Sequence, residues 1–218
     1  MPQTLKIDFV SDVACPWCAV GLASLETALR KLDGEVAVEM HFQPFELNPD
    51  MPPGGQDVTE HLTQKYGSTA EQQAVAREGI RKRGEEVGFS FRKEGRGRVY
   101  NTFDAHRLLH WAGLQGADVQ RKLKMALLEA YHGQGRSMED QAVLLDAVTQ
   151  AGLDRAEGET VLKEGRYAQE VRATEQHFQS LGIRAVPSVI INDRHLIQGG
   201  QPPEMFEQAL RQLAAQGE

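Results

Sequence analysis

The feature that most constrains this chain is a pair of cysteines two residues apart, in the run Cys15-Pro16-Trp17-Cys18. They are the only cysteines among its 218 residues. Residues 5–10, before the pair, alternate apolar and polar side chains as a strand does, and residues 20–32, after it, carry apolar side chains at helical spacing. A C-x-x-C pair at the junction of a strand and a helix is typical of a redox-active dithiol.

The start of a helix gives the two thiols different properties. The first amides of a helix have no intrahelical acceptor, and the helix dipole places partial positive charge there. A thiol at that end ionises more easily, and the thiolate is the nucleophile in disulfide exchange. Pro16 suits the first turn, where its missing N–H is not needed. We therefore predict that Cys15 is the attacking thiol and that Cys18, one turn deeper, is the resolving thiol.

A zinc site or two unrelated thiols would fit the cysteine pair less well. A structural zinc site needs four ligands, usually from a second C-x-x-C or a histidine pair at matching spacing, and the chain has no third cysteine. His106 and His110 are four residues apart but lack the H-E-x-x-H pattern, so no metal site is predicted. Two unrelated buried thiols would not be expected to fall at the same strand-to-helix junction.

Charge and hydropathy exclude other classes of function. The net charge of -7 argues against the basic surface that nucleic-acid binding requires. No apolar run approaches the roughly 18 residues of a membrane span. Residues 1–4 show neither the charged nor the apolar part of a secretory leader. We therefore expect a cytoplasmic protein with no nucleic-acid or membrane partner.

The first part of the chain predicts half of an α/β sheet. A strand at residues 4–10, a helix at 16–32 and a strand at 36–42 form a βαβ unit, whose two strands must be parallel. Residues 45–55 are rich in proline and glycine and mark an irregular exit from the sheet.

The middle of the chain reads as almost wholly helical. Leu123, Leu127 and Ala130 show the spacing of a buried helix face, and so do Leu144 and Val148. The predicted helices cover residues 57–66, 69–87, 102–114, 118–132, 139–151, 154–164 and 167–181.

The sheet resumes near the end. Residues 188–191 and 195–197 read as a β-hairpin around the turn at 192–194, and a last helix begins at Pro202-Pro203. The order βαβ, helices, ββα predicts an α/β thioredoxin fold split by a large all-helical insertion domain. The predicted parts are residues 1–55, 56–181 and 182–218.

Four segments of the sequence match one known family. They are Ser11 to Cys18, Pro44 to Pro49, Asn101 to Leu108, and Gly182 to Ser188 together with Gly199-Gly200. With these segments the chain resembles, over essentially its full length, the DsbA-like branch of thioredoxin-fold proteins, and within it the cytosolic FrnE-like dithiol oxidoreductases. The resemblance implies a thiol–disulfide oxidoreductase or isomerase without a bound cofactor, acting on protein or peptide thiols and disulfides.

The resemblance also assigns supporting residues. In such proteins the proline that matches Pro187 is cis and faces the dithiol, which leaves the backbone of Val186 available to an extended peptide. The alternative is a trans-proline at the first residue of a strand. Pro16 and Trp17 are expected to support the active site, Trp17 either by facing substrate or by covering the sulfurs.

Three polar residues are candidates for binding substrate. Asn101 and His106 match a family segment that lines the cleft between insertion and sheet, and Asp12 precedes the dithiol by three residues. His106 either meets substrate and the Cys15 thiolate or is a satisfied helix histidine. Asp12 either moves protons or bonds loop amides. The basic loop at 92–98 either holds carboxylates or is simply solvated.

Two further functions stay open from the sequence. Glutathione-dependent isomerases and kappa-type transferases share this layout but carry serine at the position of Cys15. The cysteine here, with Cys18 present, favours the dithiol function and leaves glutathione as a candidate redox partner. The alternatives are a 2-hydroxychromene-2-carboxylate isomerase-like or transferase-like enzyme on a small hydrophobic substrate, and a holdase for extended peptides. The sequence determines neither the net direction of electron flow nor the physiological substrate nor the oligomeric state.

Overall fold

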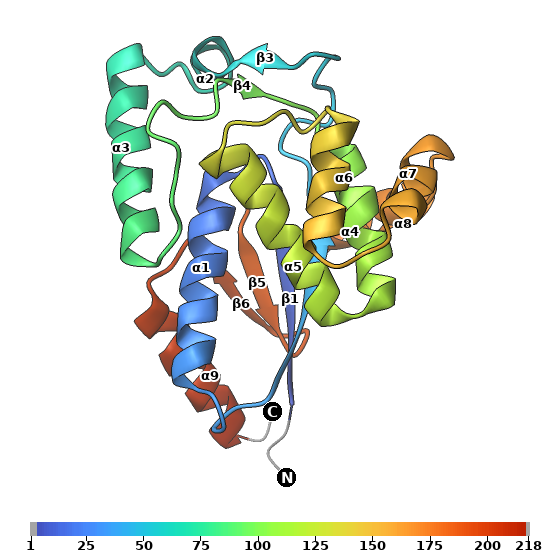
Figure 1. Ribbon diagram of the computed structural model, residues 1–218. Helices are drawn as coiled ribbons and strands as arrows, with labels where there is room; N and C mark the ends of the chain where they lie inside the picture. Colours follow the sequence, from blue (N-terminus) through green and yellow to red (C-terminus); the bar gives the residue numbers. More distant parts are fainter. Residues whose placement is uncertain (1–3, 217–218) are drawn as a thin grey trace.

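A four-stranded sheet with the strand order β2-β1-β5-β6 lies at the centre of the computed structural model, which describes residues 4–216 (Figure 1). β1 and β2 are parallel, whereas β1–β5 and β5–β6 are antiparallel, as the predicted βαβ unit and hairpin require. The strands are β1 (Leu5–Ser11), β2 (Val38–Pro44), β5 (Ser188–Ile191) and β6 (His195–Gln198).

Helices α1 (Pro16–Lys31) and α9 (Pro203–Gln216) pack against each other beside this sheet (Figure 1). α1 begins at Pro16 and has no acidic residue in its first turn, so no side chain there offsets the positive end of its dipole. Gly21 on α1 allows a close approach, because a Cβ at this position would lie only 3.0 Å from Cγ of Pro187. The turn before β5 therefore packs directly on the helix that carries the dithiol.

The predicted insertion helices are confirmed, with ends that differ by a few residues. One difference is that the helix predicted at 118–132 ends in a π-helical turn, η1. The elements are α2 (Val58–Tyr66), α3 (Ala70–Glu86), α4 (Phe103–Gln115), α5 (Ala117–Leu128), η1 (Glu129–Gly133), α6 (Gln141–Gln150), α7 (Arg155–Lys163) and α8 (Ala168–Ser180).

The insertion, predicted to be all-helical, also contains two short strands. β3 (Gln56–Asp57) and β4 (Arg98–Val99) form a small antiparallel sheet within it. Arg98 also donates from its guanidinium to the carbonyls of Gly54 and Gly55, each at 2.9 Å. Two-residue strands are too short to produce an alternating pattern, so the pairing depends on contacts between segments far apart in the sequence.

The insertion attaches to the sheet along β2, its edge strand. α4, α5 and α8 all contact β2. Gln120 on α5 accepts from the Phe42 amide at 3.0 Å and donates to the Phe42 carbonyl at 3.1 Å, so its side chain completes the outer edge of the strand. Buried residues of sheet and insertion form one continuous hydrophobic cluster. The domain limits at 55/56 and 181/182 stay a prediction.

No helix within residues 4–216 is both long and apolar enough to cross a membrane. Residues 1–3, which belong to the segment in which no secretory leader is predicted, lie outside the described part of the chain.

Candidate active site

The two cysteines lie where β1 ends and α1 begins, as free thiols. Cys15 is the N-cap of α1 and its amide donates to the Asp12 carbonyl at 3.1 Å. Cys15 is 5% exposed and Cys18 is 0% exposed, so only Cys15 reaches the surface. The turn that connects strand and helix thus leaves Cys15 slightly open to solvent and encloses Cys18 completely.

The surroundings of the two thiols move their pKa values in opposite directions. The Cys18 thiol, hydrogen-bonded to the Cys15 sulfur, lowers the pKa of Cys15 against the opposing effect of burial, and the amides of Cys18 and Trp17 lower it further. Burial raises the pKa of Cys18 well above its usual range, and the neighbouring Cys15 raises it as well. Cys15 is therefore the thiol that ionises first.

The Val186-Pro187 peptide bond is cis, as the resemblance implied. The Cys15 thiol donates to the Val186 carbonyl at 3.6 Å, so this segment lies directly opposite the Cys15 sulfur. Trp17 is 39% exposed, and a Cβ at Gly200 would lie 3.1 Å from its ring. Trp17 therefore rests on Gly200, after β6, and leaves much of its ring open to solvent.

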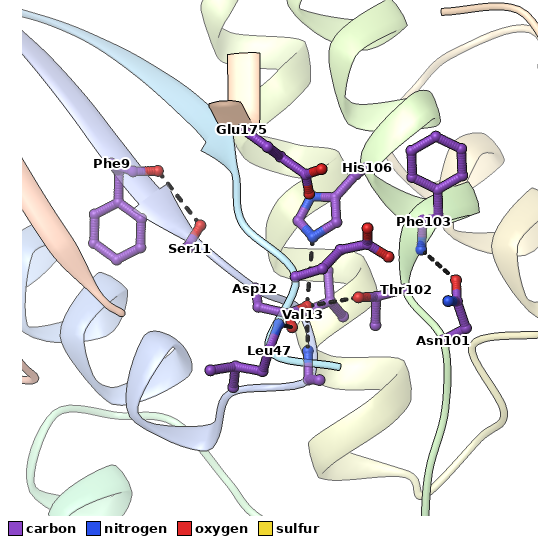
Figure 2. Close-up of polar contacts among 12 residues, drawn as sticks. Phe9, Ser11, Asp12, Val13, Leu47, Asn101, Thr102, Phe103, His106 and Glu175 are labelled. Carbon is purple, nitrogen blue, oxygen red and sulfur yellow. Dashed lines mark hydrogen bonds and ion pairs between the residues drawn. The ribbon is translucent and has the colours of Figure 1, made fainter. Parts of the chain in front are cut away.

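Asp12 lies at the centre of a buried polar network (Figure 2). Its carboxylate accepts from the amides of Ala14 at 3.0 Å and Leu47 at 2.7 Å, and from the Thr102 hydroxyl at 2.7 Å. His106 Nε2 lies 3.4 Å from the same carboxylate. Burial alone would raise the pKa of Asp12, but His106 and the two amides outweigh it and lower the pKa to about 2.

The structure brings His106 to this network and Asn101 to the neighbouring loop at Pro49, rather than either to the sulfurs. His106 is buried and contacts Asp12. The Asn101 side chain donates to the Pro49 carbonyl at 3.2 Å and accepts from the Phe103 amide at 2.9 Å. Neither side chain makes a hydrogen bond to Cys15 within residues 4–216. Both connect the start of α4 to the loops below the dithiol, and a role in binding substrate stays a prediction.

Two insertion residues contact the active-site loop: His132, which the sequence did not single out, and Arg96 of the basic loop at 92–98. His132 donates from Nε2 to the Val13 carbonyl at 2.8 Å, and burial lowers its pKa to about 3, so the imidazole is neutral. The Arg96 guanidinium donates to the Ala14 carbonyl and lies over the Tyr131 ring. The 92–98 segment is therefore not a simply solvated loop, because it holds the loop that precedes Cys15.

Lys124 was also missed, although a signal was present. It is a lysine within the apolar face of α5, between Leu123 and Leu127, and it is 1% exposed. A charged residue inside an apolar stripe is a reason to look for a special environment.

Asp12→Asn is expected to lower the free energy of unfolding by about 2 kcal/mol at neutral pH, because the folded protein holds this carboxylate about two pKa units below its ordinary value. The folded pKa is depressed, so this stability is present above about pH 4 and is lost as the pH falls toward 2. Urea unfolding of both proteins should show the difference at neutral pH and show it shrinking in acid.

The matched control is Asp146→Asn. Asp146 is an exposed carboxylate that pairs with Arg136 and Arg155, so its replacement should have little effect. A difference at Asp12 that stays constant down to pH 2 would contradict the assignment of a buried, ionised carboxylate.

Comparison with known proteins identifies the family to which this chain belongs. A model of the DSBA-like thioredoxin domain matches residues 6–211. The chain is 34% identical to a probable DsbA oxidoreductase, SCO1869, from Streptomyces coelicolor, with a TM-score of 0.89 over 98% of this chain and 91% of that one. It is 27% identical to the uncharacterized protein YwbO of Bacillus subtilis, over 95% of this chain and 96% of that protein.

A more distant likeness is to the cytosolic disulfide reductase DsbM from Pseudomonas aeruginosa, in a structure determined with GSH. The identity is 16% and the TM-score is 0.65, over 96% of this chain and 99% of that one, so this likeness concerns the fold. From the family model and the close agreement with SCO1869, the chain belongs to the DsbA-like thioredoxin-domain family of thiol–disulfide oxidoreductases.

Proposed function

We propose that this protein is a cytoplasmic thiol–disulfide oxidoreductase in which Cys15 is the nucleophile and Cys18 is the resolving thiol. The observation that carries the proposal is the asymmetry of the pair. Cys15 keeps a small exposed area and has a lowered pKa, whereas Cys18 is fully enclosed and has a raised pKa. In a pair of this kind, the first thiol can form a mixed disulfide with a substrate, and the second thiol can then resolve that disulfide.

The reaction needs no bound cofactor. The Cys15 thiolate attacks a substrate disulfide, a Cys15–substrate bond forms, and the other substrate sulfur leaves as a thiolate. Cys18 then attacks the Cys15 sulfur, which forms the Cys15–Cys18 disulfide and releases the second substrate thiolate. Two electrons pass from the enzyme to the substrate. The same steps in reverse oxidise a substrate dithiol, and the ambient redox poise decides the direction.

The segment opposite Cys15 supports a peptide or protein as substrate. The Val186 carbonyl faces the Cys15 thiol, and within residues 4–216 the Val186 amide makes no backbone hydrogen bond. An extended peptide can pair with such a segment while its disulfide meets the attacking sulfur. Glutathione is a second candidate thiol, in line with the GSH present in the DsbM structure.

The order in which the two thiols are alkylated tests this proposal. With limiting iodoacetamide slightly below neutral pH, the reduced protein is expected to be labelled at Cys15 first, because only the thiolate reacts and Cys15 ionises more easily. Peptide mapping by mass spectrometry identifies the site. Urea-unfolded protein is the control, in which both thiols should react at similar rates. Labelling of folded protein at Cys18 first would reverse the assignment.

An apolar cavity beside the dithiol supports a second candidate, a glutathione-dependent isomerase or transferase. The cavity has a volume of about 380 Å³ and lies between α2, α3 and the 92–96 loop. Much of its wall is apolar and is formed by Val58, Leu62, Ile80 and Phe91. Two arginines, Arg77 and Arg96, also face the cavity, and neither has a carboxylate partner within residues 4–216. Pro16 lines the cavity as well and joins it to the active site.

The two candidates differ in their need for Cys18. An isomerase that uses bound glutathione should keep its turnover of a small apolar substrate in Cys18→Ala protein, whereas a dithiol oxidoreductase should lose insulin reduction. Turnover of 2-hydroxychromene-2-carboxylate with glutathione and reduction of insulin, measured on the same preparations, separate them.

A further inference from the structure

Among the buried titratable groups that the exchange steps of Cys15 and Cys18 leave unused is the amine of Lys124. The residue is 1% exposed, and within residues 4–216 its side chain makes no hydrogen bond or ion pair. An amine buried without a partner costs several kcal/mol relative to an apolar side chain of the same size. Such a group is a structural liability unless it takes part in chemistry.

The packing of α5 places this amine near the end of the strands that carries the active site. Gln120 is bound to Phe42 of β2, and Lys124 follows one helical turn later on the same face, roughly 6 Å along the axis. Pro44 lies roughly 6.6 Å beyond Phe42 along the strand. It pairs in register with Ser11, the residue before Asp12. Figure 1 shows α5 beside α1, to which Arg121 is joined by its ion pair with Glu26 at 2.7 Å.

A second cavity connects Lys124 to the outside of the molecule. We call it the flank cavity; its volume is about 210 Å³ and it is partly open to solvent. Both Lys124 and Pro44 line it, and His41, His106 and His110 add polar groups to its wall. Neither cysteine and no residue of the β5–β6 hairpin lines the flank cavity, so it is separate from the mouth at which substrate meets Cys15.

The charges of Lys124 and the dithiol act on each other. Burial lowers the pKa of Lys124, and the nearby Cys18, Asp12 and Cys15 partly oppose this. In turn the Lys124 charge lowers the pKa of Cys18, against the larger raising effect of burial. The other titratable groups facing it are neutral His132 on η1 and the flank-cavity histidines on β2 and α4. Burial therefore brings the pKa values of the amine and the inner thiol closer together, while the attraction between their charges opposes this.

We propose that Lys124 accepts the proton of Cys18 when the mixed disulfide is resolved, returns a proton to Cys18 in the reverse direction, and exchanges it with solvent through the flank cavity. The proposal rests on the dithiol function proposed above. The dithiol function requires a proton acceptor for Cys18, because an enclosed thiol with a raised pKa must still lose its proton before it can attack.

The step balances without any further reactant. The neutral Lys124 amine takes the proton of the Cys18 thiol, directly or through one water. The Cys18 thiolate attacks the Cys15 sulfur, the Cys15–Cys18 bond forms, and the Cys15–substrate bond breaks with the electron pair leaving on the substrate sulfur. The Lys124 ammonium then loses its proton through the flank cavity. In reverse, the ammonium protonates Cys18 as it leaves.

Mixing reduced protein with Ellman's disulfide in a stopped-flow instrument distinguishes the reaction rate of Cys15 from that of Cys18. Attack by Cys15 releases one coloured thiolate at a rate that depends on the reagent concentration, and attack by Cys18 releases a second at a rate that does not. For Lys124→Met we expect an unchanged first phase and a second phase about a hundredfold slower at neutral pH, in the usual range for loss of a general base. At alkaline pH hydroxide removes the Cys18 proton, so the two proteins should converge.

The control is Lys122→Met, an exposed position on the same helix, which should leave both phases unchanged. Lys124→Arg is the second variant, because arginine keeps the charge but does not release its proton at these pH values, so it should show the same slow second phase. A wild-type second phase in either Lys124 variant, or a slowing by the same factor at every pH, would overturn the proposal. A missing first phase in the wild-type protein would instead overturn the role of Cys15.

Discussion

Cys15→Ser protein is expected to lose thiol–disulfide exchange by roughly a thousandfold or more, while Cys18→Ala protein is expected to accumulate mixed disulfides. A serine hydroxyl does not ionise near neutral pH, and Cys18 cannot replace Cys15, because it is 0% exposed and has a raised pKa. Without Cys18 the intermediate at Cys15 has no internal thiol to break it.

Two measurements check this pair of variants. Insulin reduction in the presence of a thiol reductant gives the exchange rate, and intact-mass spectrometry after incubation with oxidised glutathione detects the adduct on Cys18→Ala protein. The double variant Cys15→Ser/Cys18→Ala is the control and should form no adduct. Cys15→Ser protein that reduces insulin at the wild-type rate would refute the division of roles.

Gln120→Leu is expected to lower the free energy of unfolding by about 3 kcal/mol, because the amide and carbonyl of Phe42 lose their partner at a buried strand edge. The Leu109 carbonyl also loses a donor, at 3.1 Å. Leucine fits the helix as well as glutamine does, so the loss does not arise from helix propensity. In a chain of this size the expected fall in Tm is about 6 to 12 °C.

Thermal and urea unfolding of Gln120→Leu protein measure this loss. The matched control is Lys122→Leu, which adds the same residue to an exposed position of α5 and should change the unfolding free energy little. If both variants unfolded at the same temperature, Gln120 would not be what holds the insertion to β2.

The elements closest to the dithiol followed from local sequence. The strand at 5–11 and the helix that begins at Pro16 have clear periodicity and a clear start signal, and the structure places them as expected. The cis bond at Pro187 followed from the resemblance rather than from residue patterns, because an isolated X-Pro dipeptide does not report its isomer.

The candidate substrate-binding residues show where the sequence stopped being informative. Asp12 was considered both as a proton carrier and as a partner of loop amides. It does bind the Ala14 and Leu47 amides, but it also binds Thr102 and contacts His106, some ninety residues away. No pattern within residues 11–18 indicates that α4 supplies these partners, since they come together only when the insertion closes over the loop.

The sequence by itself determined that two thiols lie at a strand-to-helix junction, that one of them stands at the positive end of a helix, and that long helical segments separate the two halves of one sheet. Each depends on spacing over at most a few turns, and spacing is a local property. Only the tertiary structure decided that His132 and Arg96 hold the loop before Cys15 and that Lys124 lies buried beside the dithiol. Burial and charge coupling depend on which distant segments meet, and they set the pKa values on which the chemistry of Cys15 and Cys18 depends.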